Sequence, residues 1–183
     1  MSSQEIRSVI VPITEAEILI PNATVAEVMS FVEPQPIEDS PAWVLGSFLW
    51  RGWQVPLISF AVLTETTALE STRNARICVT KSLTGNDRMP YFAILAQAFP
   101  RLTTISDTGL IEVPSSHKPI AVAGRLVIDE REVVVPDLDR LGHLVAHAAF
   151  GALPLTRHRI RSDLRADSAP SQDNAADLPP QAS

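Results

Sequence analysis

The sequence predicts an all-β fold that ends in a single helix. Its 15 prolines are spread along the whole chain, and proline disrupts helix interiors because it lacks a backbone donor. Apolar residues recur in short runs separated by polar or proline-containing breaks, a pattern typical of short strands joined by turns. Apolar residues at helical spacing occur near the end of the chain, at positions 138–145.

Each strand is expected where β-branched or aromatic residues dominate a short run. Between positions 43 and 58 two such runs meet at Arg51–Gly52, and glycine permits the left-handed backbone of a tight turn. A second turn is expected at Asp129–Glu130–Arg131. The expected strands are residues 9–13, 18–21, 25–32, 43–50, 53–58, 77–79, 91–95, 121–128 and 132–135.

Two further segments complete the expected organisation. Residues 64–74 are polar and are expected to form a connector without regular structure. A helix should begin near Pro136–Asp137, because aspartate can accept from the free amides of the first turn, and should end at Gly151 and Pro154. Residues 1–155 are therefore expected to form the folded domain, and residues 156–183 a disordered tail.

The composition limits the classes of function. Hydrophobic residues make up 45% of the 183 residues, enough for one domain or for two small subdomains that share a core. A net charge of −6 argues against a nucleic-acid platform, which needs a basic face. A single cysteine excludes an internal disulfide and a multi-cysteine zinc site, and fits a reducing compartment.

The sequence contains no predicted targeting or membrane-spanning segment. Its start lacks the basic-then-apolar pattern of a secretory signal, so the mature chain is expected to begin near Met1. Residues 41–63 form the most apolar stretch, but Arg51 lies near its centre. Because a charged side chain at bilayer depth is costly, a buried core is the better interpretation.

No catalytic site is evident in the sequence. Phosphate-binding loops and dinucleotide fingerprints are absent, and Ser47 lacks the flanking glycines of a nucleophile elbow. Asp139, His143 and His147 share one helix face and could hold a metal in a metal-dependent enzyme. However, Leu144 stands where the metalloprotease motif has glutamate, so a solvated face is the preferred interpretation.

Other reactive residues have simpler explanations. Cys78 lies among β-branched residues without a basic neighbour in sequence, which favours a buried structural thiol over a nucleophile. The basic run at positions 157–165 could contact lipid headgroups or nucleic acid, but the acidic tail dilutes it and favours a solvated linker. Ordinary turn and loop exposure accounts for Glu15, Glu17, Asp129, Glu130, His117 and Lys118.

Arg51 is the strongest candidate for a binding residue. It lies in an apolar segment between Trp50 and Trp53. An exposed turn arginine would explain it, and so would a guanidinium stacked on aromatic rings and offered to a partner. Tryptophan and arginine are also enriched at interface hot spots.

The order of these features resembles the CheW-like family of chemotaxis coupling proteins, across residues 6–150. The family has a "V-x-E-V/I" strand, followed by the pattern "G-x-x-x-x-R-G-x-x-x-P-V/I-x-D-L". In this chain the matching positions are Val25, Glu27, Val28, Gly46, Arg51, Gly52, Pro56, Leu57 and Ile58. Within the family, the chain looks most like the ChpC type, the accessory adaptors of systems that govern type IV pilus twitching motility.

The chain also departs from the family pattern. Ser59 replaces the aspartate, Phe60 stands where leucine is usual, and the connector lacks the family's basic "L-R-x-x-F" segment. These departures favour a changed partner preference over a changed fold.

The resemblance implies two intertwined five-stranded, SH3-like β-barrels with a shared core and a C-terminal helix. It implies a non-catalytic cytoplasmic adaptor without cofactor or metal, associated with receptor arrays, that joins chemoreceptor tips to the regulatory domain of a CheA-type histidine kinase. Val25, Glu27 and Arg51, with Trp50 and Trp53, would face a partner, while Gly46, Gly52 and Pro56 would shape the backbone. The alternative is an SH3-like interaction module outside chemotaxis.

Overall fold

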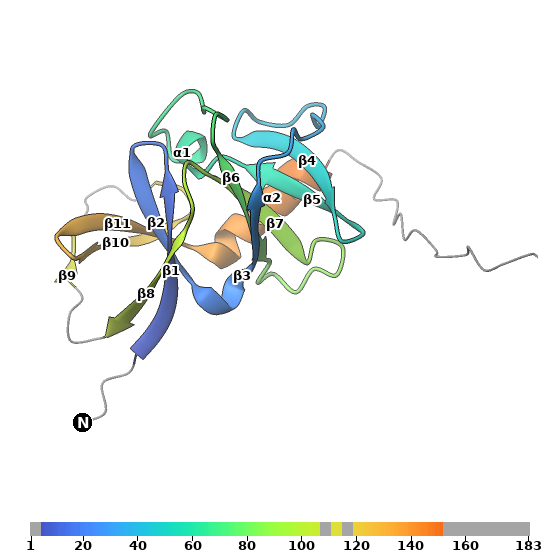
Figure 1. Ribbon diagram of the computed structural model, residues 1–183. Helices are drawn as coiled ribbons and strands as arrows, with labels where there is room; N and C mark the ends of the chain where they lie inside the picture. The colour runs from blue at the N-terminus through green and yellow to red at the C-terminus, as the bar shows by residue number, and fades with distance from the viewer. Residues whose placement is uncertain (1–4, 107–110, 115–118, 152–183) are drawn as a thin grey trace, which may run out of the picture.

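Two antiparallel-rich β-sheets and a C-terminal helix make up the protein (Figure 1). The structure is a computed structural model, and it describes residues 5–106, 111–114 and 119–151. Its elements are β1 (Glu5–Ile13), β2 (Ala16–Pro21), η1 (Asn22–Thr24), β3 (Val25–Ser30), β4 (Val44–Trp50), β5 (Trp53–Ile58), α1 (Phe60–Leu63), β6 (Arg76–Lys81), β7 (Tyr91–Ala96), β8 (Arg101–Ser106), β9 (Ile111–Glu112), β10 (Val122–Ile128), β11 (Arg131–Pro136) and α2 (Leu138–Phe150).

The first sheet is built around two hairpins, β1–β2 and β10–β11. The hairpins join in parallel where Val134 of β11 pairs with Ile18 of β2. The strand order is β8-β1-β2-β11-β10-β9. This sheet therefore has six strands rather than the expected five, because the two residues of β9 pair with Leu126 and Val127 of β10.

The second sheet has five strands, as expected, in the order β3-β6-β7-β5-β4. Its edge strands β3 and β4 are brought together by the loop that follows β3. The Gln35 N–H donates to the Ser47 carbonyl at 2.8 Å, and the Ser47 N–H donates to the Gln35 carbonyl at 2.8 Å. This bridge returns the chain to the opposite edge, which is how a small barrel satisfies its edge strands.

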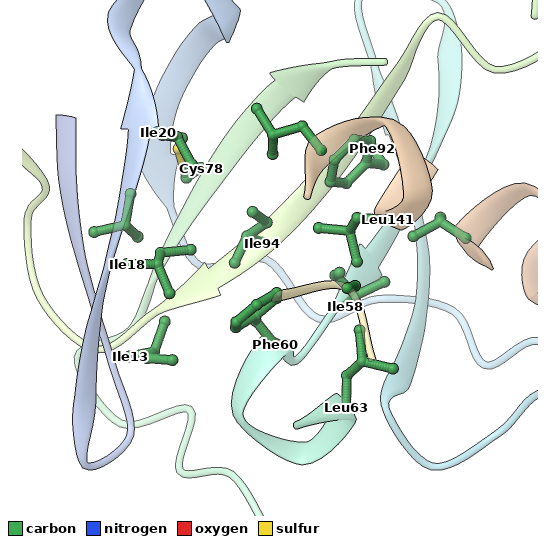
Figure 2. Packing of buried hydrophobic residues seen from close by; sticks show 14 of the residues in the cluster. Ile13, Ile18, Ile20, Ile58, Phe60, Leu63, Cys78, Phe92, Ile94 and Leu141 are labelled. Atoms are coloured by element: carbon green, nitrogen blue, oxygen red, sulfur yellow. The ribbon is translucent and has the colours of Figure 1, made fainter. Parts of the chain in front are cut away.

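One core is shared by both sheets and both helices (Figure 2). Because strands here carry apolar residues on both faces, each sheet also buries a smaller cluster on its other side, such as Ile10 with Leu19 in the first sheet and Phe48 with Leu57 in the second. Burial of one such side chain contributes about 1.5–3 kcal/mol. Labelled members of the shared core are Ile13, Ile18, Ile20, Ile58, Phe60, Leu63, Cys78, Phe92, Ile94 and Leu141.

The C-terminal helix begins and ends where the sequence predicts. Asp137 is its N-cap, and its Oδ1 accepts from the Arg140 N–H at 3.0 Å. The buried side of α2 carries Leu138, Leu141, Val145 and Ala149, at the spacing of one helix face. The prediction that the chain combines an all-β core with a terminal helix is therefore confirmed.

Four short elements were missed from the sequence: η1, α1, β8 and the two-residue strand β9. Strand β8 has only two apolar residues, Leu102 and Ile105, which do not alternate with polar ones, and it pairs only with β1 among the described strands, so its hydrophobic signal is weak. The four-residue helix α1 is too short for a periodic pattern. Residues 64–75 carry no helix or strand, which confirms the connector. The domain boundary at residue 155 and the tail remain predictions, because residues 152–183 lie outside the described part of the chain.

Candidate partner-binding surface

The β4–β5 hairpin presents the candidate residues at its tip. Arg51 and Gly52 both have positive φ, +47° and +82°, as the two central residues of a type I′ turn require. Trp50 and Trp53 pair directly across the hairpin beside this turn. A left-handed backbone costs free energy for every residue except glycine. Gly52 therefore adopts it without this cost, whereas Arg51 does not.

Glu27 of β3 gathers two donors from this tip. Its Oε2 accepts from Arg51 Nη2 at 2.7 Å and from the Trp50 indole N–H at 3.1 Å. The Arg51 guanidinium carbon also lies 4.9 Å from the centre of the Trp50 ring. Because β3 and β4 are opposite edges of the sheet, these contacts add a side-chain link to the Gln35–Ser47 bridge.

Exposure separates the residues that can meet a partner from those that support them. The Arg51 side chain is 68% exposed and that of Glu27 36%, whereas Trp50 is only 8% exposed. Trp50 packs edge-on against Tyr91 at 4.9 Å between ring centres. Trp50 therefore anchors Glu27 and Arg51 from beneath and has little surface of its own to offer.

Apolar surface flanks the exposed ion pair. Trp53 is 37% exposed and also meets the Tyr91 ring edge-on, at 6.3 Å. Leu49, which sequence reasoning passed over, is 60% exposed and pairs with Gln54 across the hairpin. Val25 is half-buried at the start of β3 and packs against the shared core. The surface thus combines one charged pair with one exposed apolar side chain, Trp53. Leu49 and Gln54 form the next cross-strand pair and therefore point to the opposite face of the hairpin.

Gly46 allows the loop after β3 to approach β4. Its φ is +136°, and a Cβ placed there would lie 2.4 Å from the Gln35 carbonyl oxygen. The strand register shifts at this point, between Val44 and Gly46. Only glycine accommodates both the close contact and the backbone conformation.

Pro56 is buried within β5 opposite Ser47 of β4. The pairing of β5 with β7 begins at the next residue, Leu57, opposite Ala93. Proline has no backbone N–H, but Pro56 precedes the residues of β5 that pair with β7. The missing donor therefore costs the β5–β7 pairing no hydrogen bond.

The histidine stripe of α2 is exposed. His143 Nε2 lies 3.8 Å from Asp139 Oδ1, and both side chains are 65% exposed. Within residues 5–106, 111–114 and 119–151, no group of three or more histidine, cysteine, aspartate or glutamate residues is placed to hold a metal ion. No helix in the same ranges is long and apolar enough to cross a bilayer.

Cys78 lies in the shared core and is fully buried. Burial raises the pKa of its thiol to about 11, and a hydrogen bond with Thr80 opposes the shift. A thiol that stays protonated near neutral pH is a poor nucleophile.

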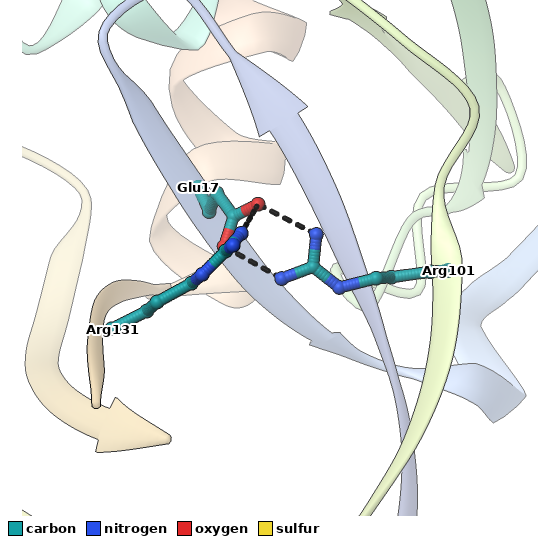
Figure 3. Close-up of polar contacts among 3 residues, drawn as sticks. All are labelled: Glu17, Arg101 and Arg131. Atoms are coloured by element: carbon teal, nitrogen blue, oxygen red, sulfur yellow. Dashed lines mark hydrogen bonds and ion pairs between the residues drawn. The ribbon is translucent and has the colours of Figure 1, made fainter. Parts of the chain in front are cut away.

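Glu17 takes part in a surface charge cluster (Figure 3). Arg101 of β8 binds it through two hydrogen bonds of 2.7 and 2.9 Å, and Arg131 of β11 lies 3.9 Å away. The Glu17 hydrogen bond raises the pKa of Arg101. Glu15, Asp129 and Glu130 have positive φ in hairpin turns. Three of these carboxylates therefore lie in turns, and Glu17 forms ion pairs with arginines of two other strands.

The remaining candidates, His117, Lys118 and the basic run at 157–165, lie outside the described residues.

One family model and one solved structure match the chain. A model of the CheW-like domain matches residues 7–145. The structure is similar to the crystal structure of scaffolding protein TtCheW from Thermoanaerobacter tengcongensis, with a TM-score of 0.62, 17% identity, and coverage of 74% of this chain and 86% of that chain. At this identity the likeness shows the fold. No curated protein matches the chain in sequence.

Proposed function

Because the chain belongs to the CheW-like domain family, we propose that it is a non-catalytic adaptor that couples chemoreceptors to a CheA-type histidine kinase. The observation that carries this proposal is the extent of the family match. Residues 7–145 include most of β1, all of β2 through β11 and more than half of α2, so the match spans both sheets and most of the shared core.

The partner surface that we propose is the tip of the β4–β5 hairpin with Glu27. Arg51 and Trp53 are exposed there, and arginine and tryptophan are residue types that dominate binding energy when a partner buries them. A receptor tip or the regulatory domain of the kinase would shield the Arg51–Glu27 pair from water and thereby strengthen it.

The mechanism follows from binding alone. An adaptor that holds a receptor and a kinase together raises the effective concentration of one near the other. If it binds one kinase conformation more tightly, it shifts the kinase population toward that conformation. We place this activity in the cytoplasm, at receptor arrays, and assign the chain to the ChpC type of twitching-motility systems. Deletion of its gene should then impair twitching and leave swimming intact.

Co-purification of the tagged chain from its native cell tests the proposal. Mass spectrometry of the bound fraction should recover a CheA-type kinase and a methyl-accepting receptor. An Arg51→Ala bait with unchanged expression serves as the matched comparison and should recover less of at least one of them. Recovery of other proteins without either chemotaxis partner would instead support an SH3-like interaction module outside chemotaxis.

A further inference from the structure

Glu70, in the connector between α1 and β6, binds residues from three separate parts of the chain. Its Oε1 accepts from the Ser59 hydroxyl at 2.6 Å. Its Oε2 accepts from the Thr14 hydroxyl and from the Gln97 amide, the latter at 2.8 Å. The Gln97 amide also donates to the carbonyl of Ser71 at 3.0 Å. The connector is therefore held by one carboxylate and its neighbouring backbone.

The three donors come from both sheets. Thr14 lies in the turn of the β1–β2 hairpin, in the six-stranded sheet. Ser59 follows β5 in the five-stranded sheet, and Gln97 follows β7 in the same sheet. Gln97 also donates its backbone N–H to the Pro12 carbonyl of β1 at 2.8 Å. Glu70 thus lies at the junction of the two sheets and joins all three segments.

Ser59 is suited to this position because its hydroxyl is both donor and acceptor. It accepts from the Val62 N–H at 2.9 Å, which caps α1, and donates to Glu70. The residue is fully buried. An aspartate here could cap α1 equally well, but when ionised it has no proton to donate and would face Glu70 as a second negative charge.

We propose that Glu70 acts as a latch: its hydrogen bonds hold residues 64–75 against the junction of the two sheets. This arrangement requires an uncharged hydrogen-bond donor at position 59, which Ser59 provides. Ser59 itself is joined to the base of the β4–β5 hairpin, because its N–H donates to the Trp43 carbonyl at 2.8 Å just before β4. The connector thereby links the β1–β2 turn to the β4–β5 hairpin. Arg51 lies at the opposite end of that hairpin.

A charge exchange between positions 59 and 70 tests the latch without reference to any partner. Ser59→Asp should lower the Tm, since it places two carboxylates together. Adding Glu70→Gln should recover much of that loss, because the glutamine amide can donate to the new aspartate. Glu65→Gln is the matched control: Glu65 is exposed in the same connector, and it should not rescue Ser59→Asp. Equal Tm changes for Glu70→Gln in the wild-type and Ser59→Asp backgrounds would overturn the proposal.

Hydrogen exchange of the Glu70→Ala variant gives an independent readout. The Thr66 N–H, which donates to the Ala61 carbonyl at 2.8 Å, should exchange faster by about tenfold or more, because hydrogen bonds to a charged group are lost. Amides of the β1–β2 turn should also lose protection, while those of the β10–β11 hairpin should not. Faster exchange in the connector alone would show that Glu70 does not couple the sheets.

Discussion

Arg51 and Glu27 form an ion pair of 2.7 Å between the two opposite edges of the five-stranded sheet. The pair is exposed, and Arg51 has a left-handed backbone, with φ of +47°, as a central residue of the β4–β5 turn. Such a conformation costs about 1–2 kcal/mol for a residue other than glycine. An exposed pair contributes only about 0–1 kcal/mol, so stability alone does not account for the arginine.

Arg51→Ala should therefore leave folding intact and weaken partner binding. Alanine has the same left-handed penalty as arginine, so the Tm should change little. We expect the affinity for the kinase regulatory domain or the receptor tip to fall about tenfold or more, as for a residue at an interface hot spot. Calorimetric titration measures this, with Arg140→Ala on α2 as a control. A large loss of thermal stability would mean that Arg51 is structural.

Gly46→Ala should be strongly destabilising. The new Cβ would lie 2.4 Å from the Gln35 carbonyl oxygen at a φ of +136°, so the bridge to Ser47 must open or the strand must shift. We expect a loss of about 2–4 kcal/mol in the free energy of unfolding, measured with urea. Gly85→Ala is the control, since Gly85 also has positive φ but faces open space. Similar losses for both variants would argue that only the backbone angle matters.

Asp137→Ala should lower the free energy of unfolding by about 1 kcal/mol, because the first turn of α2 loses its cap. Asp137→Asn keeps an acceptor for the Arg140 N–H and should stay close to the wild type. Thermal unfolding of the three proteins measures both effects. An equal loss in the asparagine variant would indicate that the charge, rather than the cap, is required.

Because the Cys78 thiol is buried, we expect the protein to lose stability at alkaline pH. Its thiol pKa rises from 9.0 to about 11 on folding, so between these values the unfolded chain loses the proton first. Stability is complete below pH 9 and falls as pH rises toward 11, by about 3 kcal/mol in full. Urea unfolding at pH 8 and pH 10 should show this fall, and Cys78→Ala should reduce it. An unchanged pH dependence in that variant would assign the fall to other groups.

Strands with strong local patterns were predictable and those without were not. The runs around Val9, Ile77 and Phe92 are apolar because both faces are buried, and they were located correctly. Strand β8 has Leu102 73% exposed and Ile105 buried, so it lacks the apolar density of a core strand. The partner-binding role of the hairpin-tip residues remains a prediction until the binding experiments are done.

The sequence by itself determined the local elements: the turn at Arg51–Gly52, the cap at Asp137, the connector and the strand runs. Turn geometry, capping and hydrophobic periodicity depend on neighbours within a few residues. Only the tertiary structure decided that Glu27 meets Arg51 and that Glu70 meets Thr14, pairs separated by 24 and 56 positions. Such contacts depend on which strands become neighbours when a shared core is buried, and no local pattern encodes that choice.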